Sequence, residues 1–108
     1  LAMRAGIPIA MGTDAGAYGY GRNAWELELL TEAGMTPMEA IVASTKSAAE
    51  CLGLESDIGT LEPGKYADLL VIDGDPLADI GLLQRVDSMP LVVKTGDIVA
   101  DRRVTPVA

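Results

Sequence analysis

The pattern of apolar residues changes at Gly53, and this change predicts a chain of two differently built halves. Before Gly53, a short apolar run at residues 6–12 is followed by a glycine-rich loop at 13–22 and then by apolar residues at helical spacing. After Gly53, short apolar runs alternate with turn residues, which indicates strands. Residues 1–53 are therefore predicted to form a β/α unit with an extra helix, and residues 54–108 to be β-rich.

The first half begins with a predicted strand and helix. Residues 6–12 are apolar and bounded by glycines, so we expect a buried strand there. Asn23 followed by Glu26 matches a capping box, which predicts a helix that starts at Asn23 and ends at Gly34. Trp25, the only tryptophan, is expected to pack this helix rather than to stack on a ligand.

A second helix is predicted immediately afterwards. Thr36 as N-cap, Pro37 at the first helical position and Glu39 three residues after the cap form another start signal. The helix is expected to continue to Gly53. Cys51 falls in this apolar helical stretch and is expected to be buried and unreactive, and a single cysteine excludes an internal disulfide.

The second half is predicted from its turns. Residues 62–65 form a turn around Pro63 and Gly64, with Glu62 and Lys65 expected to be exposed. The other expected elements are a strand at 67–73, a brief helical turn at 77–83, and a hairpin with strands at 91–94 and 98–100 around a turn at 95–97.

Length and charge exclude several functions. The 108 residues can form one small domain with a core but are too few for a whole barrel enzyme. Sixteen acids against eight bases give a net charge of −8, which repels nucleic acid and anionic membranes, so neither is expected as a partner. The chain contains no apolar run long enough to span a membrane and no signal-peptide pattern, so a cytoplasmic location is the default expectation.

Asp14 is the main candidate for a catalytic residue. It directly follows the apolar run at residues 6–12, and parallel α/β folds place reactive groups at the carboxy ends of strands. Aspartates at such positions are also common turn residues, so a purely local role in the loop stays open. The chain contains no histidine, which excludes imidazole as a ligand or base within it.

The glycine-rich loop permits two further interpretations. Glycines before a helix can bind phosphate, which would make the chain a nucleotide-binding module, but the Lys-Ser/Thr ending of a P-loop and the Gly-x-Gly-x-x-Gly fingerprint are absent. Alternatively, Tyr18, Tyr20 and Arg22 contact a substrate carboxylate or aromatic ring. Ordinary packing of the loop is the competing role for each of the three.

Several segments, in order along nearly the whole chain, resemble the amidohydrolase superfamily. The most specific, at residues 58–73, is similar to the stretch where that family's chain leaves its barrel and enters a small β-domain. The resemblance points to the branch that holds imidazolonepropionases and prolidase-like dipeptidases. The segments are 9–16 (IAMGTDAG), 23–30 (NAWELELL), 34–40 (GMTPMEA), 43–49 (ASTKSAA), 58–73 (IGTLEPGKYADLLVID), 74–77 (GDPL) and 92–97 (VVKTGD).

The resemblance implies an α/β fold, with residues 1–53 as the last β/α unit of a (β/α)8 barrel and 54–108 as the C-terminal strands of a small β-sandwich domain. The intact parent is then a metal-dependent hydrolase of C–N bonds that acts on a dipeptide-like or cyclic amide substrate. In that family, the aspartate matching Asp14 binds a divalent metal, usually zinc, and shuttles a proton from metal-activated water to the leaving amine. Asp68 matches a structural turn and is expected to accept backbone hydrogen bonds there.

The rest of such a site is missing from the sequence. The family's other metal ligands are histidines, often with a lysine carbamate, on earlier strands, and catalytic zinc takes about three protein ligands. Residues 1–5 also look like the end of a helix, so we expect a C-terminal fragment that is inactive alone and holds no metal tightly. A severed barrel exposes apolar surface, which makes a self-associating interaction module the alternative.

Overall fold

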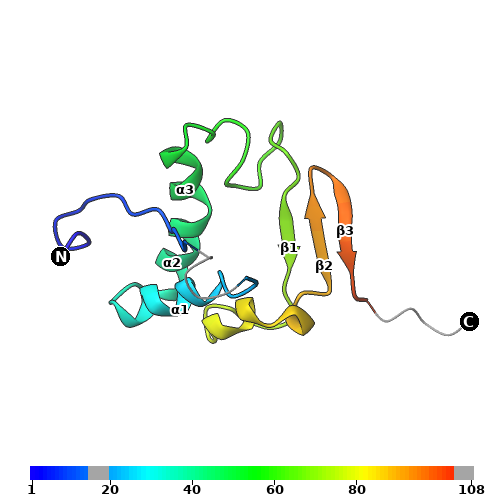
Figure 1. Cartoon of the computed structure of the whole chain (residues 1–108). Helices are drawn as coiled ribbons and strands as arrows, with labels where there is room; N and C mark the ends of the chain where they lie inside the picture. The colour runs from blue at the N-terminus through cyan, green and yellow to red at the C-terminus, as the bar shows by residue number, and fades with distance from the viewer. Residues whose placement is uncertain (15–19, 104–108) are drawn as a thin grey trace, which may run out of the picture.

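The computed structural model describes residues 1–14 and 20–103, and it separates a helical region from a small sheet (Figure 1). The helices are α1 (Trp25–Glu32), α2 (Pro37–Ser44) and α3 (Lys46–Cys51). The strands are β1 (Leu69–Val71), β2 (Leu91–Lys94) and β3 (Asp97–Asp101), and two 3₁₀ helices, η2 (Ile80–Gln84) and η3 (Val86–Ser88), connect β1 to β2. None of the helices in the described residues is long and apolar enough to cross a membrane.

The N-cap of helix α1 lies one residue later than the sequence predicted. Its N-cap is Ala24, with no side-chain capping bond, so the expected Asn23–Glu26 box is wrong. The backbone explains the difference, because the N–H groups of Trp25 and Glu26 donate to the carbonyls of Arg22 and Asn23 at 3.0 and 3.2 Å. A tight turn before the helix thus satisfies these donors without a side chain.

Helix α1 ends just before Gly34, as the sequence predicted. Gly34 has φ +119°, and its N–H donates to the carbonyl of Thr31 at 3.1 Å. The N–H of Met35 donates to the carbonyl of Leu30 at 3.1 Å. This pair of bonds is a Schellman motif, which satisfies carbonyls left open at the helix end and turns the chain towards α2.

Helix α2 confirms the second capping box. The hydroxyl of Thr36 accepts a hydrogen bond from the N–H of Glu39 at 3.1 Å, and the Glu39 carboxylate accepts one from the N–H of Thr36 at 3.4 Å. The predicted single helix is nevertheless broken at Thr45, which has φ −123° and ψ −87°. The hydroxyls of Ser44 and Thr45 both donate to the carbonyl of Ile41 at 2.8 Å, and such local bonds compete with the regular helix.

The predicted strand at residues 6–12 does not form in the described part of the chain. The segment is extended, and the N–H of Met11 donates to the carbonyl of Ala43 at 2.8 Å, which ties it to α2. Ile7 is 57 % exposed, so the segment is not buried either. A strand requires a partner edge, and β1, β2 and β3 pair only with one another.

Cys51 is exposed, contrary to expectation. Helix α3 buries the face that carries Ala49, which is 3 % exposed. Cys51 is two residues further on, roughly 200° around the helix axis, and so lies away from the packed face.

The sheet has the order β1-β2-β3, and both pairs are antiparallel. The predicted hairpin is confirmed, with a two-residue turn in which Thr95 and Gly96 have φ of +53° and +81°. Positive φ at both positions is typical of a type I′ turn, whose twist matches the flanking strands. Strand β1 covers only three of the residues predicted for it, because its pairing with β2 involves Leu69, Leu70 and Val71 alone.

The core lies in the helical region. Leu27, Met35, Ala40 and Ala43 form one buried cluster, and Ile80 and Leu83 of η2 pack against it. The two regions are therefore in contact, with η2 running beneath α1 in Figure 1.

The chain exposes more surface than its mass requires. Its accessible area is 7431 Å², whereas a folded monomer of 11.2 kDa exposes about 5,700 Å². Its radius of gyration is 15.1 Å, against about 13 Å for a compact domain of this length. The accessible area therefore exceeds the value for a compact monomer by roughly 1,700 Å².

Candidate functional site

Asp14 ends the extended segment that is tied to α2. Its side chain is exposed, and its backbone has φ +45°, in the left-handed region. Only Asp14 and Thr95 among the described non-glycine residues have positive φ. Aspartate tolerates this conformation better than most residues, but it costs free energy, and such positions cluster at functional sites. The carboxylate is thus accessible on a backbone of defined, strained geometry.

The described residues do not by themselves build a metal centre. They contain no group of three or more histidine, cysteine, aspartate or glutamate side chains placed to share an ion. Asp14 offers a carboxylate, which is a suitable oxygen ligand for a divalent cation, but catalytic zinc takes about three protein ligands. Any complete metal site that includes Asp14 requires ligands from outside residues 1–14 and 20–103.

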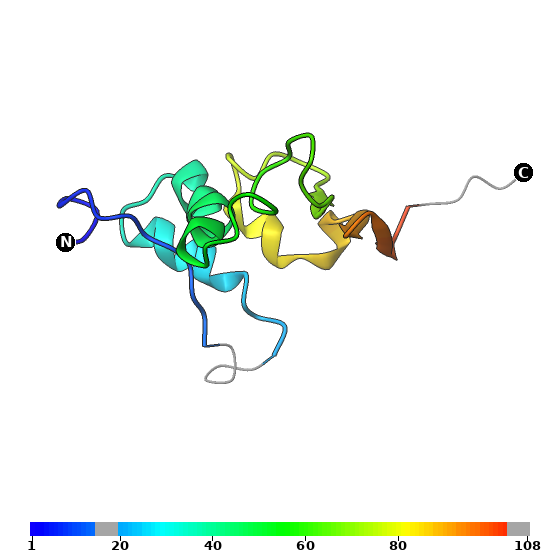
Figure 2. The same ribbon diagram turned by 90° about the horizontal axis from the view of Figure 1, so that it is seen from above.

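The structure describes two of the three residues that were expected to contact substrate. Tyr18 lies outside the described residues. Tyr20 is 92 % exposed, and the guanidinium carbon of Arg22 lies 4.9 Å from the centre of the Trp25 ring. The described segments before residue 15 and after residue 19 lie on the same side of the helical region (Figure 2).

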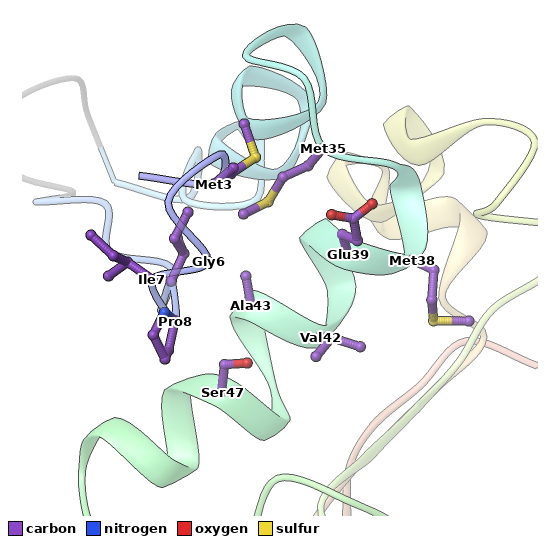
Figure 3. Close-up of a pocket in the computed structure, with 11 residues that line it drawn as sticks. Met3, Gly6, Ile7, Pro8, Met35, Met38, Glu39, Val42, Ala43 and Ser47 are labelled. Carbon is purple, nitrogen blue, oxygen red and sulfur yellow. The ribbon is translucent and has the colours of Figure 1, made fainter. Parts of the chain in front are cut away.

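A groove that the sequence did not predict lies between the amino-terminal segment and α2. It has a volume of about 370 Å³, and its lining is mainly apolar (Figure 3). Glu39 is the only titratable residue in its wall, and its carboxylate belongs to the cap of α2. The groove therefore lacks groups for catalysis. Its lining comprises Met3, Gly6, Ile7, Pro8, Ile9, Met35, Met38, Glu39, Val42, Ala43 and Ser47.

Asp68 holds the hairpin rather than contributing to a site. Its carboxylate accepts hydrogen bonds from the N–H of Thr95 at 2.8 Å and from the ammonium of Lys94 at 3.0 Å. The bond from the Thr95 N–H, and to a smaller extent the bond from Lys94, lowers the pKa of Asp68 below its ordinary value. The expectation that Asp68 accepts from backbone is confirmed, although the donor belongs to the β2–β3 turn and not to its own.

Lys65 was expected to be exposed, but its side chain is only 15 % accessible. Its ammonium donates to the hydroxyl of Thr60 at 2.7 Å and lies 3.0 Å from the carboxylate of Glu62. The hydrogen bond from the Thr60 hydroxyl, and to a smaller extent Lys65, lowers the pKa of Glu62 below its ordinary value. The three side chains close the turn around Pro63 and Gly64, so their role is structural.

Known proteins resemble this chain along most of its length. The model of the amidohydrolase family matches residues 1–99. An ochratoxinase from Aspergillus niger is 37 % identical over 99 residues, which cover 90 % of this chain and 20 % of the relative. An imidazolonepropionase from Thermoplasma volcanium is 33 % identical over 99 residues, covering 90 % of this chain and 24 % of the relative.

Solved structures give the same result. The crystal structure of a Xaa-Pro dipeptidase with methionine bound in its active site superposes with a TM-score of 0.83 at 38 % identity. The match covers 90 % of this chain and 23 % of the dipeptidase. The chain thus spans about a fifth to a quarter of the length of these relatives.

Proposed function

This chain belongs to the amidohydrolase family, and we propose that it forms the carboxy-terminal part of a metal-dependent hydrolase of C–N bonds. In this proposal residues 1–53 supply the last β/α unit of a barrel, and residues 54–108 supply strands of a small β-domain. The substrate is a dipeptide-like or cyclic amide, a class suggested by the names of the dipeptidase and the imidazolonepropionase. The observation that carries the proposal is the family match over residues 1–99, which includes Asp14 on its strained backbone.

The exposed surface supports a larger parent. The excess of roughly 1,700 Å² is about twice the area that one partner buries in a standard protein interface, about 800 Å². Residues 6–12 form an extended segment without a strand partner in the described chain, and the apolar groove lies beside it. Further protein packed against this side would cover both.

Asp14 is the residue of this chain that acts in the reaction. Its carboxylate takes a proton from the attacking water as the C–O bond forms, and it returns that proton to the nitrogen as the C–N bond breaks. Asp14 would be one of the ligands of a divalent metal, zinc in our proposal, and such a metal would lower the pKa of a bound water to near ~7. Because the other ligands are not in these residues, we propose that the 108 residues alone are catalytically inactive.

The test is Asp14→Asn in the full-length protein that carries this chain. Asparagine keeps the size and tolerates the left-handed backbone but cannot carry the proton, so kcat for amide substrates should fall about 10³-fold with an unchanged melting temperature. Asp97→Asn, at the first residue of β3, is the matched control and should leave kcat unchanged. Activity of Asp14→Asn within tenfold of the parent would contradict the role, and absence of any metal-dependent amide hydrolysis would contradict the function.

The excess surface also favours a second candidate, a non-catalytic module that associates with copies of itself. Exposed apolar side chains such as Ile7, Met38 and Val99 would then be buried between copies. Light scattering on the 108-residue chain decides this point, since a monomer at high concentration is incompatible with self-association.

A further inference from the structure

We propose that the hydroxyls of Ser44 and Thr45 position Asp14 for the reaction by breaking the helix between α2 and α3. The break releases one helix carbonyl, that of Ala43, and this carbonyl anchors the segment that ends in Asp14. The inference rests on the proposed function, because it takes Asp14 as the group that moves the proton. It adds two positioning residues, which act on the reaction through another side chain.

The first step is a change of hydrogen bonding at the end of α2. In a regular α-helix the N–H of Thr45 would donate to the carbonyl of Ile41, four residues earlier. Here that N–H donates instead to the carbonyl of Val42 at 3.2 Å. The hydroxyls of Ser44 and Thr45 both donate to the Ile41 carbonyl at 2.8 Å. The two hydroxyls thus replace the backbone donor, and Thr45 takes φ −123° and ψ −87°, outside the helical range.

The second step is the release of the carbonyl of Ala43. In an unbroken helix the N–H of Ser47 would donate to it. Among the described residues, its backbone donor is instead the N–H of Met11, at 2.8 Å. Ala43 is 2 % exposed, and the carbonyl of so buried a residue costs free energy unless a donor satisfies it. The break and the bond from Met11 therefore depend on each other.

The third step leads from Met11 to Asp14, three residues later. Residues 6–12 pair with no strand in the described chain, and their other backbone donors in hydrogen bonds, Gly6 and Ile7, lie at the far end of the segment. The bond at Met11 is thus the backbone hydrogen bond nearest to Asp14 within the part of the chain that the structure describes. The left-handed backbone of Asp14 is costly and persists only where its surroundings fix it, so loss of this bond lets the carboxylate shift.

The experiment uses the full-length protein that carries this chain. The double variant Ser44→Ala, Thr45→Val removes both hydroxyls, so the helix should continue and the N–H of Ser47 should take the carbonyl of Ala43. Hydrogen exchange followed by mass spectrometry should then show faster exchange at the amide of Met11. At saturating zinc, kcat for amide substrates should fall about tenfold with KM changed less than about twofold, because the proton carrier is misplaced while the groups that bind substrate stay.

Two variants serve as controls. Thr45→Ser keeps the hydroxyl and should hold kcat within about twofold of the parent. Thr31→Val removes the same kind of bond from α1, where the Thr31 hydroxyl donates to the carbonyl of Glu28 at 2.7 Å. This variant should change neither kcat nor the exchange at Met11.

The inference is overturned if the parent is active and the double variant keeps its kcat, or if the exchange at Met11 is unchanged. It is also overturned if Thr31→Val lowers kcat as much as the double variant, because a general loss of helix stability would then explain the effect. In each of these cases the proposed function stands. A parent that hydrolyses no amide overturns the proposed function, and this inference with it.

Discussion

The helical and sheet regions are held together by different means. All five buried hydrophobic side chains of the described chain lie between Leu27 and Ala49, whereas the sheet region contains none. Four of the five ion pairs among the described residues, in contrast, lie after Gly53. The first region therefore depends on packing, and the second depends on turns and polar contacts that remain accessible to water.

This difference matters for the site. Asp14 is attached to the packed region through the bond from Met11 to Ala43, so its position depends on α2 and not on the sheet. The helical region is contacted by later parts of the chain in two places, where η2 packs against the core and where the backbone at Gly59 approaches Ala49. Substitutions at the junction, in the packed region and in the sheet region test this division.

The largest effect is expected at the junction. A Cβ added to Gly59 would lie 2.6 Å from the Cβ of Ala49 and 3.2 Å from the carbonyl oxygen of Thr45, and the glycine has φ +100°. Steric overlap and backbone strain together should make Gly59→Ala lower the free energy of unfolding by about 3 kcal/mol, measured by urea denaturation.

Gly64→Ala is the matched control for this prediction. Gly64 has a similar φ of +93°, but no atom lies within 4 Å of an added Cβ, so only the strain remains. A loss of about 1 kcal/mol is expected. Equal losses for the two variants would contradict the expected steric overlap between a Cβ at Gly59 and Ala49.

A smaller effect is expected at the start of α2. Thr36→Ala removes the hydroxyl that accepts the N–H of Glu39, which should cost about 1 kcal/mol of unfolding free energy. Asn23→Ala, at the other predicted cap, should cost less than about 0.5 kcal/mol because α1 uses no side-chain cap. Thermal denaturation of both variants, followed by circular dichroism at 222 nm, distinguishes the two positions.

The smallest effect is expected when acid protonates the carboxylates that hold the hairpin. Hydrogen bonds from Thr95 and Lys94 lower the pKa of Asp68, and those from Arg103 lower the pKa of Asp101 to about 2. A carboxylate with a lowered pKa stabilises the fold above its unfolded value, about 4, and loses that contribution as the pH falls through the folded value. The sheet region should therefore loosen between about pH 4 and pH 2.

Amide chemical shifts of β2 and β3 during an acid titration measure this change. Asp68→Asn should reduce the acid sensitivity of the turn, whereas Asp97→Asn, whose side chain has no partner in the described chain, should not. A hairpin whose amide shifts respond identically in both variants would contradict the role of Asp68.

Local chemistry is what the sequence could predict. The cap at Thr36, the turn at Gly64 and the hairpin at residues 95–96 depend on a few neighbouring residues, and all three are confirmed. The strand at residues 6–12 and the burial of Cys51 depend on what packs against them, which a local pattern does not contain.

The candidate site divides in the same way. Asp14 and its position after an apolar segment could be predicted from the sequence, because both are identified by the order and spacing of motifs along the chain. The stack of Arg22 on Trp25 was not predicted, since it depends on how the chain turns into α1. The groove beside α2 was missed for a similar reason: its walls come from segments about thirty residues apart.

The edges of the small sheet determine how so much exposed surface can behave. Strand β1 has three residues. Strand β3 contains a register shift opposite Val92 and Val93, begins and ends with Asp97 and Asp101, and is followed by Arg103. Short, bulged and charged edges are poor templates for adding further strands. Contact with other protein is therefore expected to occur through faces that are fully covered once one partner has bound. Growth into fibrils by addition of strands is expected to be slow.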